Sequence, residues 1–146
     1  MKSLLILFSF FALTAFTGWE TNFEKAKKTA KEKQQLILLN FSGSDWCGPC
    51  IRMKKEIFES KVFSNMADSN LVLVNADFPR NKKNKLSKEL TKQNESLADR
   101  YNADGKFPFT LLLNADGHVI KTWDGLPDAD AARFAAEVKA ICNAHK

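Results

Sequence analysis

The five residues Trp46-Cys47-Gly48-Pro49-Cys50 constrain the fold of this chain more than any other feature of its sequence. Residues 36–41 before them are mostly apolar and predict a buried strand, and residues 51–59 after them contain no Gly or Pro and predict a helix. A cysteine pair on a strand-to-helix turn suits thiol–disulfide exchange, because N–H groups at a helix start stabilise a thiolate on the first cysteine. The second cysteine is then close enough to attack a mixed disulfide and release the product.

Two other uses of such a pair stay open on the residues alone. A zinc site needs two further ligands at suitable spacing, and the chain offers only Cys142, His118 and His145, none of them paired. A purely structural disulfide is the other use, but a loop this short constrains little of the unfolded chain. Redox chemistry is therefore the favoured interpretation, and no metal is expected. No cofactor is expected either, because no Gly-rich nucleotide-binding motif follows a strand.

The N-terminus predicts export. Lys2 gives a short positive start, and residues 4–16 form a nearly unbroken apolar run, which matches a signal peptide and is short for a membrane span. Small residues at Ala15 and Thr17 offer a cleavage site, although no clean Ala-x-Ala is present. We expect a signal peptide at residues 1–17 and one domain at residues 18–146. An uncleaved membrane anchor is the alternative, and export follows in either case.

The mild positive charge of the chain gives little support for nucleic acid or membrane as a partner. The formal net charge is +5, and the lysines concentrate in residues 25–33 and 82–92. No aromatic side chains alternate with these lysines, so nucleic-acid binding is not expected. Such runs usually form solvated faces, and attraction to acidic partners or to an anionic membrane has only weak support.

Cys142 is left over from the pair, because the chain has 3 cysteines. It falls in a predicted C-terminal helix in which Phe134, Val138, Ile141 and Cys142 are apolar at helical spacing. We expect a buried free thiol that fills core space, with a regulatory or intermolecular role as the alternative.

The remaining pattern predicts a single α/β domain. An alternation of helices and apolar strands favours parallel pairing, with helices on both faces of the sheet. The expected helices are 21–33, 49–59, a short turn at 62–66, 86–100 and a last helix that Asp128 or Asp130 caps and that ends near 143. The expected strands are 35–42, 71–77, 109–113 and 118–123.

This order of elements resembles the thioredoxin fold, an α/β fold with a central mixed sheet flanked by helices. The motif at residues 46–50 has the letters of the thioredoxin active site, and Phe107-Pro108-Phe109-Thr110 matches the cis-proline segment of that family. The hairpin at 114–123, followed by Gly125, also matches. The resemblance covers residues 35–143, and the sequence before the motif looks like that of exported thioredoxin-like proteins of Gram-negative bacteria.

The resemblance implies roles for the site residues. Cys47 is implied to be the attacking thiol and Cys50 the resolving one, within an active-site turn that includes Trp46, Gly48 and Pro49. A cis bond is implied at Phe107-Pro108, where the backbone of Phe107 would pair with an extended substrate. The alternative is that Pro108 only begins the strand in trans.

The chain departs from the family at two positions. Thioredoxins carry a buried Asp on the strand before the motif, and Asn40 or Phe41 stands there in this chain, neither of which can take a proton. Asp45 is close in sequence but is expected on the exposed turn. Phe107 is bulkier than is usual for its position, so Trp46 and Phe107 are expected to form an apolar rim around Cys47. Core packing of Trp46 against the motif helix is the alternative.

The resemblance favours an exported reductase of protein disulfides in the periplasm, active as a monomer. Thioredoxin lies near −270 mV and a strong periplasmic oxidant near −120 mV, a gap of about 7 kcal/mol for two electrons. A membrane thiol carrier would then supply the electrons. A periplasmic oxidase or isomerase is one alternative, and a thioredoxin-like binding module without turnover is another.

Overall fold

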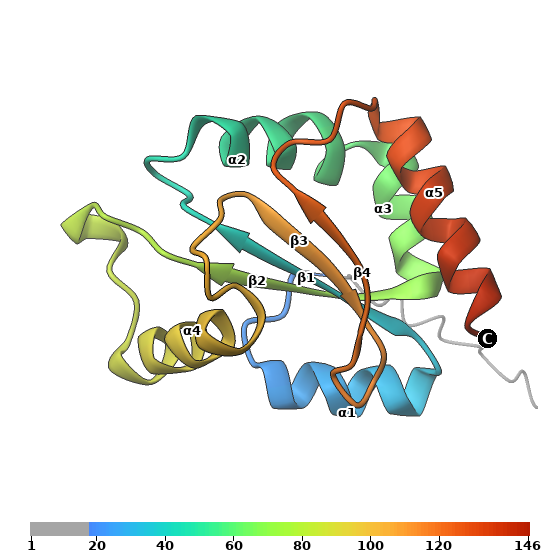
Figure 1. The fold of residues 1–146 in the computed structure, drawn as a ribbon, viewed down its shortest axis with the longest axis horizontal. Coiled ribbons are helices and arrows are strands. Elements are labelled where there is room, and N and C mark those ends of the chain that lie inside the picture. The colour runs from blue at the N-terminus through green and yellow to red at the C-terminus, as the bar shows by residue number, and fades with distance from the viewer. Residues whose placement is uncertain (1–17) are drawn as a thin grey trace, which may run out of the picture.

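The computed structural model describes residues 18–146, so the expected signal peptide at residues 1–17 lies outside the described residues. One four-stranded sheet has the order β2-β1-β3-β4, and helices cover it on both faces (Figure 1). In chain order the elements are α1 (Phe23–Lys33), β1 (Leu36–Ser42), α2 (Gly48–Met53), η1 (Lys54–Phe58), α3 (Lys61–Asn70), β2 (Leu71–Asp77), η2 (Lys82–Asn84), α4 (Lys88–Tyr101), β3 (Phe109–Leu113), β4 (Val119–Asp124) and α5 (Ala131–Ala144).

The sheet is mixed. Strand β1 pairs in parallel with β2, from Leu36 opposite Leu71 to Ser42 opposite Asp77. It pairs antiparallel with β3, and β3 pairs antiparallel with β4. The parallel pairing expected from the alternation of elements therefore holds for β1 and β2 only, and β3 pairs antiparallel with both of its neighbours. The mixed sheet that the resemblance implied is confirmed.

Alternate residues of β1 face two separate cores. Leu36 and Leu38 point to a cluster with Phe63 and Phe134 beneath α2, α3 and α5. Ile37, Leu39 and Phe41 point to the opposite cluster beneath α1 and α4. Because successive side chains of a strand face opposite sides, a strand buried on both faces needs the unbroken apolar run that the sequence shows.

The helix after the motif changes its winding. It is α-helical over α2 and then makes a π turn, η1, where a regular helix was expected through residue 59. The adjacent residues Ile57 and Phe58 of this wider turn both lie in the core, with Ile57 at 2% and Phe58 at 6% exposure. Helix α3 is also longer than the short turn predicted, and Ser60 caps it by accepting the N–H of Phe63.

The last helix and its cysteine agree with the sequence. Asp130, rather than Asp128, caps α5 by accepting the N–H of Arg133. Cys142 is a free thiol at 3% exposure within the core under α5, as expected, and burial raises its pKa. No helix within residues 18–146 combines the length and hydropathy needed to cross a membrane.

Candidate active site

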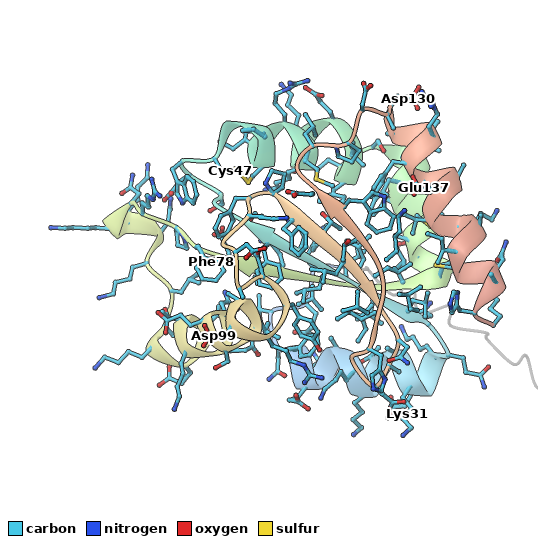
Figure 2. The ribbon with its side chains drawn as sticks, viewed as in Figure 1. Lys31, Cys47, Phe78, Asp99, Asp130 and Glu137 are labelled. Carbon is cyan, nitrogen blue, oxygen red and sulfur yellow. A yellow bond between two sulfur atoms is a disulfide. The ribbon has the colours of Figure 1, made fainter. Side chains whose placement is uncertain are left out.

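Cys47 and Cys50 form a disulfide where β1 passes into α2. The S–S distance is 2.08 Å and the Cα–Cα distance is 5.2 Å. Cys47 is the N-cap residue of α2, and its Sγ accepts the backbone N–H of Cys50 at 3.3 Å. Both cysteines are 5% exposed, and Figure 2 shows Cys47 at the end of the sheet where α2 begins. Gly48 and Pro49 between them are exposed and open the helix.

The indole of Trp46 lies over the start of the motif and is held on three sides. Its Nε1 donates to the carbonyl of Phe78 at 2.7 Å. Its ring meets the Phe107 ring edge to face, with 5.4 Å between centroids. The guanidinium of Arg80 lies 3.8 Å from the ring centroid on a cation–π contact. The expected pairing of Trp46 with Phe107 is therefore present. The three contacts of the indole are with Phe78, Arg80 and Phe107, which lie outside the motif helix of the alternative.

The bond between Phe107 and Pro108 is cis, as the resemblance implied. Three neighbours fix the segment around it. The side chain of Asn102 bonds both the carbonyl and the N–H of Lys106, at 2.9 Å each. The Lys106 ammonium pairs with Asp124 at 2.7 Å, and the N–H of Gly125 donates to the carbonyl of Pro108 at 2.9 Å. The end of the β4 strand thus holds the cis-proline segment in place.

Asn40, and not Phe41, occupies the buried position on β1 behind the cysteine pair. Its Nδ2 donates to Oδ1 of Asn75 at 3.0 Å, and its Oδ1 accepts from the hydroxyl of Thr110 at 3.0 Å. Phe41 points to the opposite core with α1 and α4. A neutral amide network therefore stands where thioredoxins have a carboxylate, and an amide cannot accept a proton near neutral pH.

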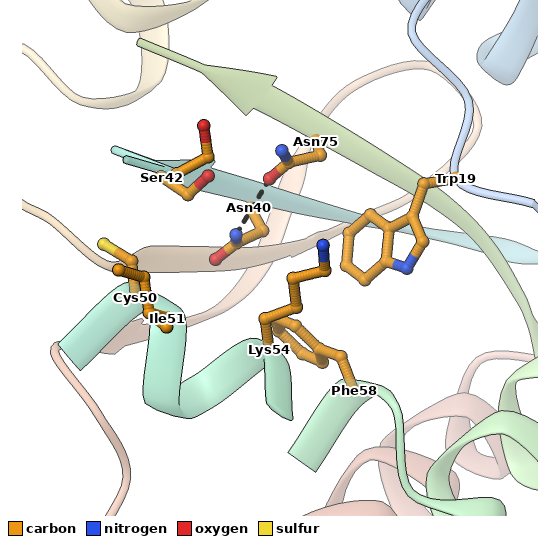
Figure 3. A pocket seen from close by; sticks show the side chains of 9 residues that line it. Trp19, Asn40, Ser42, Cys50, Ile51, Lys54, Phe58 and Asn75 are labelled. Atoms are coloured by element: carbon orange, nitrogen blue, oxygen red, sulfur yellow. Dashed lines mark hydrogen bonds between the residues drawn. The ribbon is translucent and has the colours of Figure 1, made fainter. Parts of the chain in front are cut away.

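A cavity of about 310 Å³ lies between this amide pair and the motif helix (Figure 3). Its lining is Trp19, Asn40, Ser42, Ser44, Cys50, Ile51, Lys54, Phe58 and Asn75. No carboxylate is among these residues, whereas the lysine ammonium, the two amides and the serine hydroxyls are all polar. The rest of the lining is apolar, but a cavity of this size with these polar groups has room and hydrogen-bond partners for water molecules. Water can therefore reach Cys50 from the inner side.

Asp45 has a structural task that the sequence did not reveal. Its carboxylate accepts the backbone N–H groups of Arg80 and Asn81 and the side-chain amide of Asn84, each at 2.9 Å. These bonds, that of the Arg80 N–H first and that of Asn84 next, lower the pKa of Asp45. Asp45 therefore remains an anion that anchors the loop after β2, and it is unsuited to taking a proton from Cys50.

The two cations that follow the motif differ in their surroundings. Arg52 forms a bidentate pair with Glu56, with Nε to Oε1 at 3.0 Å and Nη2 to Oε2 at 3.2 Å. Arg52 is thereby directed along the helix surface. Lys54 lines the cavity beside Cys50, and its ammonium also lies 3.8 Å from Glu59. Of the two, only Lys54 contributes to the cavity behind the disulfide.

Sequence reasoning missed the roles of four residues that shape this site. Asn75 and Thr110 complete the amide network, and Asn102 holds the cis-proline segment. Trp19 lines the cavity and packs on Phe58, with 4.9 Å between ring centroids. Asn75 could have been found from the sequence. It is the fifth residue of β2, Asn40 is the fifth residue of β1, and the two strands pair in parallel from their first residues. The other three depend on tertiary packing.

Comparison with known proteins gives a consistent set of relatives. The sequence profile of the thioredoxin-like domain family matches residues 23–141. The chain is 33% identical over 121 residues to disulfide bond reductase DsbH of Chlamydia pneumoniae, which covers 83% of this chain and 70% of DsbH. It is 28% identical over 96 residues to thioredoxin-related protein DsbJ of the same organism, of which it spans 27%.

Solved structures agree with the sequence relatives. A structure described as DsbH oxidoreductase superposes with a TM-score of 0.77 and 31% identity, covering 86% of this chain and 84% of that chain. A disulphide isomerase from Xylella fastidiosa Temecula1 superposes with a TM-score of 0.58 and 19% identity over 79% of this chain and 86% of that one. The second likeness concerns the fold alone.

Proposed function

We propose that this thiol–disulfide oxidoreductase, which belongs to the family of thioredoxin-like domains, is an exported reductase of protein disulfides. The observation that carries the proposal is the Cys47–Cys50 disulfide at the start of α2, beside a cis-proline segment and two aromatic rings. The name of the relative DsbH, disulfide bond reductase, favours the same direction of electron flow.

In the proposed reaction, Cys47 begins as a thiolate that accepts the N–H of Cys50. It attacks one sulfur of a substrate disulfide, forms a mixed disulfide and releases the first substrate thiolate. Cys50, as a thiolate, then attacks the Sγ of Cys47 and releases the second. Two electrons pass from the enzyme dithiol to the substrate, and the Cys47–Cys50 disulfide of the structure is the product.

Cys50 must lose its proton before it attacks. Asn40 and Asn75 cannot accept it, so the proton passes to water in the adjoining cavity and from there to solvent. The Lys54 ammonium at the cavity favours the thiolate over the thiol, because a nearby positive charge stabilises an anion. Lys54 thus acts on the charge of Cys50, and the amide pair offers hydrogen bonds to water in the cavity.

The substrate is proposed to bind in extended form beside the disulfide. The backbone of Phe107, just before the cis-proline, supplies strand-like hydrogen bonds. Trp46 and Phe107 supply an apolar rim over which the residues flanking the substrate disulfide pass. Gly48 and Pro49 are exposed and carry no bulk that would block the approach to Cys47.

The proposal also includes the cellular setting of the protein. Residues 1–17 act as a signal peptide, residues 18–146 form the periplasmic domain, and the domain works as a monomer. Reduction outside the cytosol requires a supply of electrons, so a membrane protein with a reducing dithiol returns the Cys47–Cys50 pair to its reduced form.

The test is the reduction potential of the Cys47–Cys50 pair, measured by equilibration with glutathione buffers. A value at or below about −250 mV supports a reductase. A value above about −180 mV refutes it and identifies an oxidase or isomerase.

Two single variants identify the roles of the thiols. Cys50→Ser is expected to accumulate mixed disulfides with partner proteins, and Cys47→Ser is expected to lose disulfide exchange. Cys142→Ala is the matched control, because it removes a thiol that lies in the core under α5. Partner capture that survives loss of both Cys47 and Cys50 would instead identify a binding module without turnover.

A further inference from the structure

We infer that residues 80–88, here called the basic loop, form a docking surface for acidic protein substrates. The inference rests on the proposed function and names the class of substrate that the site prefers. The loop contains Arg80, Lys82, Lys83, Lys85 and Lys88 and no acidic residue in nine positions. All five basic side chains are exposed.

The lysines of this loop are in no ion pair of the described residues, whereas several lysines elsewhere are paired. In α1, Lys27 pairs with Glu24 at 2.9 Å and Lys28 with Glu32 at 4.0 Å. Among the ion pairs of the described residues, none includes a lysine of the basic loop. The α1 lysines therefore belong to a mixed face, whereas the basic loop presents positive charge alone.

The loop is fixed to the active site by direct contacts. Asp45, the residue before Trp46, accepts two backbone N–H groups and the Asn84 amide of the loop. Arg80 lies against the Trp46 ring at 3.8 Å. Phe78, just before the loop, contacts the Phe107 ring with 5.5 Å between centroids. A substrate that reaches Cys47 across the aromatic rim therefore passes beside the basic loop.

The loop also encloses a hollow of about 340 Å³ that suits an acidic side chain. Arg80, Lys82 and Lys85 line it together with Phe78 and Leu86. Asp77 and Glu95 line it as well, but both Asp77 oxygens are bonded by Ser42 and Ser44. Glu95 is thus the one carboxylate of the hollow that accepts none of these hydrogen bonds. Three basic residues outnumber it, so the hollow favours an anion.

Electrostatic attraction of this kind raises association rates by about 10–10³-fold and falls steeply with salt. The experiment uses two disulfide-bonded peptides that share a core and differ in their flanks, which are rich either in Asp and Glu or in Ser and Gln. Their reduction is measured as kcat/KM at about 0.01 M and 0.15 M salt. Wild-type protein is expected to prefer the acidic peptide about tenfold at low salt.

Two triple variants distinguish an effect of the basic loop from an effect of the protein's net charge. Lys82→Gln, Lys83→Gln and Lys85→Gln together should abolish most of the preference and leave reduction of the neutral peptide unchanged. Lys28→Gln, Lys31→Gln and Lys33→Gln remove the same charge from α1, on the opposite side of the sheet from α2 (Figure 1), and should keep the preference within about twofold. Equal loss in both variants, or no preference in wild type, overturns the inference.

A binding measurement tests the docking surface independently of the proposed reductase activity. The same two peptides with alanine at both cysteines are tested for binding by fluorescence anisotropy. Loop-dependent binding of the acidic peptide without any reduction of its disulfide form would refute the proposed function and support the docking surface. Loop-dependent binding to phosphatidylglycerol vesicles, with no peptide preference, would overturn the inference in favour of a membrane surface.

Discussion

Gly43→Ala is predicted to destabilise the active site by displacing Trp46. Gly43 is buried just before the motif, and a Cβ on it would overlap Cε2, Cζ2 and Nε1 of the Trp46 indole. Relief requires the ring to move away from Gly43. Its present position depends on the hydrogen bond to Phe78, the edge contact with Phe107 and the cation–π contact with Arg80.

The expected cost follows from these three contacts. A hydrogen bond contributes about 0.5–1.5 kcal/mol, an aromatic pair about 0.5–1.5 kcal/mol and an exposed cation–π contact about 0.5–1 kcal/mol. Loss of all three predicts that the free energy of unfolding falls by about 1.5–4 kcal/mol. Urea denaturation of the oxidised protein measures this value, and the fluorescence of the displaced indole should shift at the same time.

Gly48→Ala is the matched control for this prediction. Nothing lies within 4 Å of the position that its Cβ would take, and the residue opens α2. In the oxidised protein it should be neutral or stabilising by up to about 1 kcal/mol, because alanine has less freedom to lose in a helix. If Gly43→Ala stayed within about 0.5 kcal/mol of wild type with unchanged fluorescence, the packing argument would be refuted.

Three further predictions concern the amide network, the anchor of the basic loop and the core. Asn40→Asp places a carboxyl at 5% exposure, where burial raises its pKa, so the variant should lose about 1–3 kcal/mol at pH 7 and recover stability as pH falls toward 4, measured by urea denaturation at both pH values. It should also speed the resolution of mixed disulfides in stopped-flow assays above the pKa of the new carboxyl, and an unchanged rate would show that water alone suffices. Asp45→Ala should destabilise the protein at pH 7, and its difference from wild type should shrink in acid, because the lowered pKa of Asp45 gives stability that is present above its unfolded pKa and is lost as pH falls through the folded value. A difference between wild type and Asp45→Ala that stays constant as pH falls below the unfolded pKa would contradict this assignment. Phe134→Ala removes a fully buried ring that contacts Phe58, Phe63 and Trp123 and should cost about 3–5 kcal/mol, whereas Val62→Ala, at 44% exposure, should stay within about 1 kcal/mol. Similar losses in both variants would contradict the assigned core.

The elements that the sequence predicted well are those with strong local signals. The apolar run at 36–42 became β1 with every residue buried, and the Val-rich run at 71–77 became β2 with the predicted limits. Asp130, one of the two expected caps of the last helix, caps α5 because its side chain accepts a backbone N–H group at the first turn. The Cys-x-x-Cys turn was found where a strand meets a helix.

The parts that the sequence missed depend on distant contacts. The π turn at η1 buries Ile57 and Phe58 in one core, and helical periodicity over so few residues does not reveal the change from α to π winding. Asp45 was expected on an exposed turn, but its role comes from a loop more than thirty positions later, with a sequence separation of 35 to Arg80. The turn at 114–117 predicts the antiparallel pairing of β3 with β4, whereas antiparallel pairing of β3 with β1 was expected only through the mixed sheet of the family resemblance.

The burial of Cys142 makes its thiol a natural probe of local opening in the oxidised protein. The other two sulfurs are joined in the disulfide, so this thiol alone can react with a maleimide or with Ellman's reagent. At 3% exposure and with a raised pKa, it reacts only when the packing of α5 opens. The labelling rate of unmodified protein therefore reports how often the C-terminal helix separates from the core, without any introduced probe.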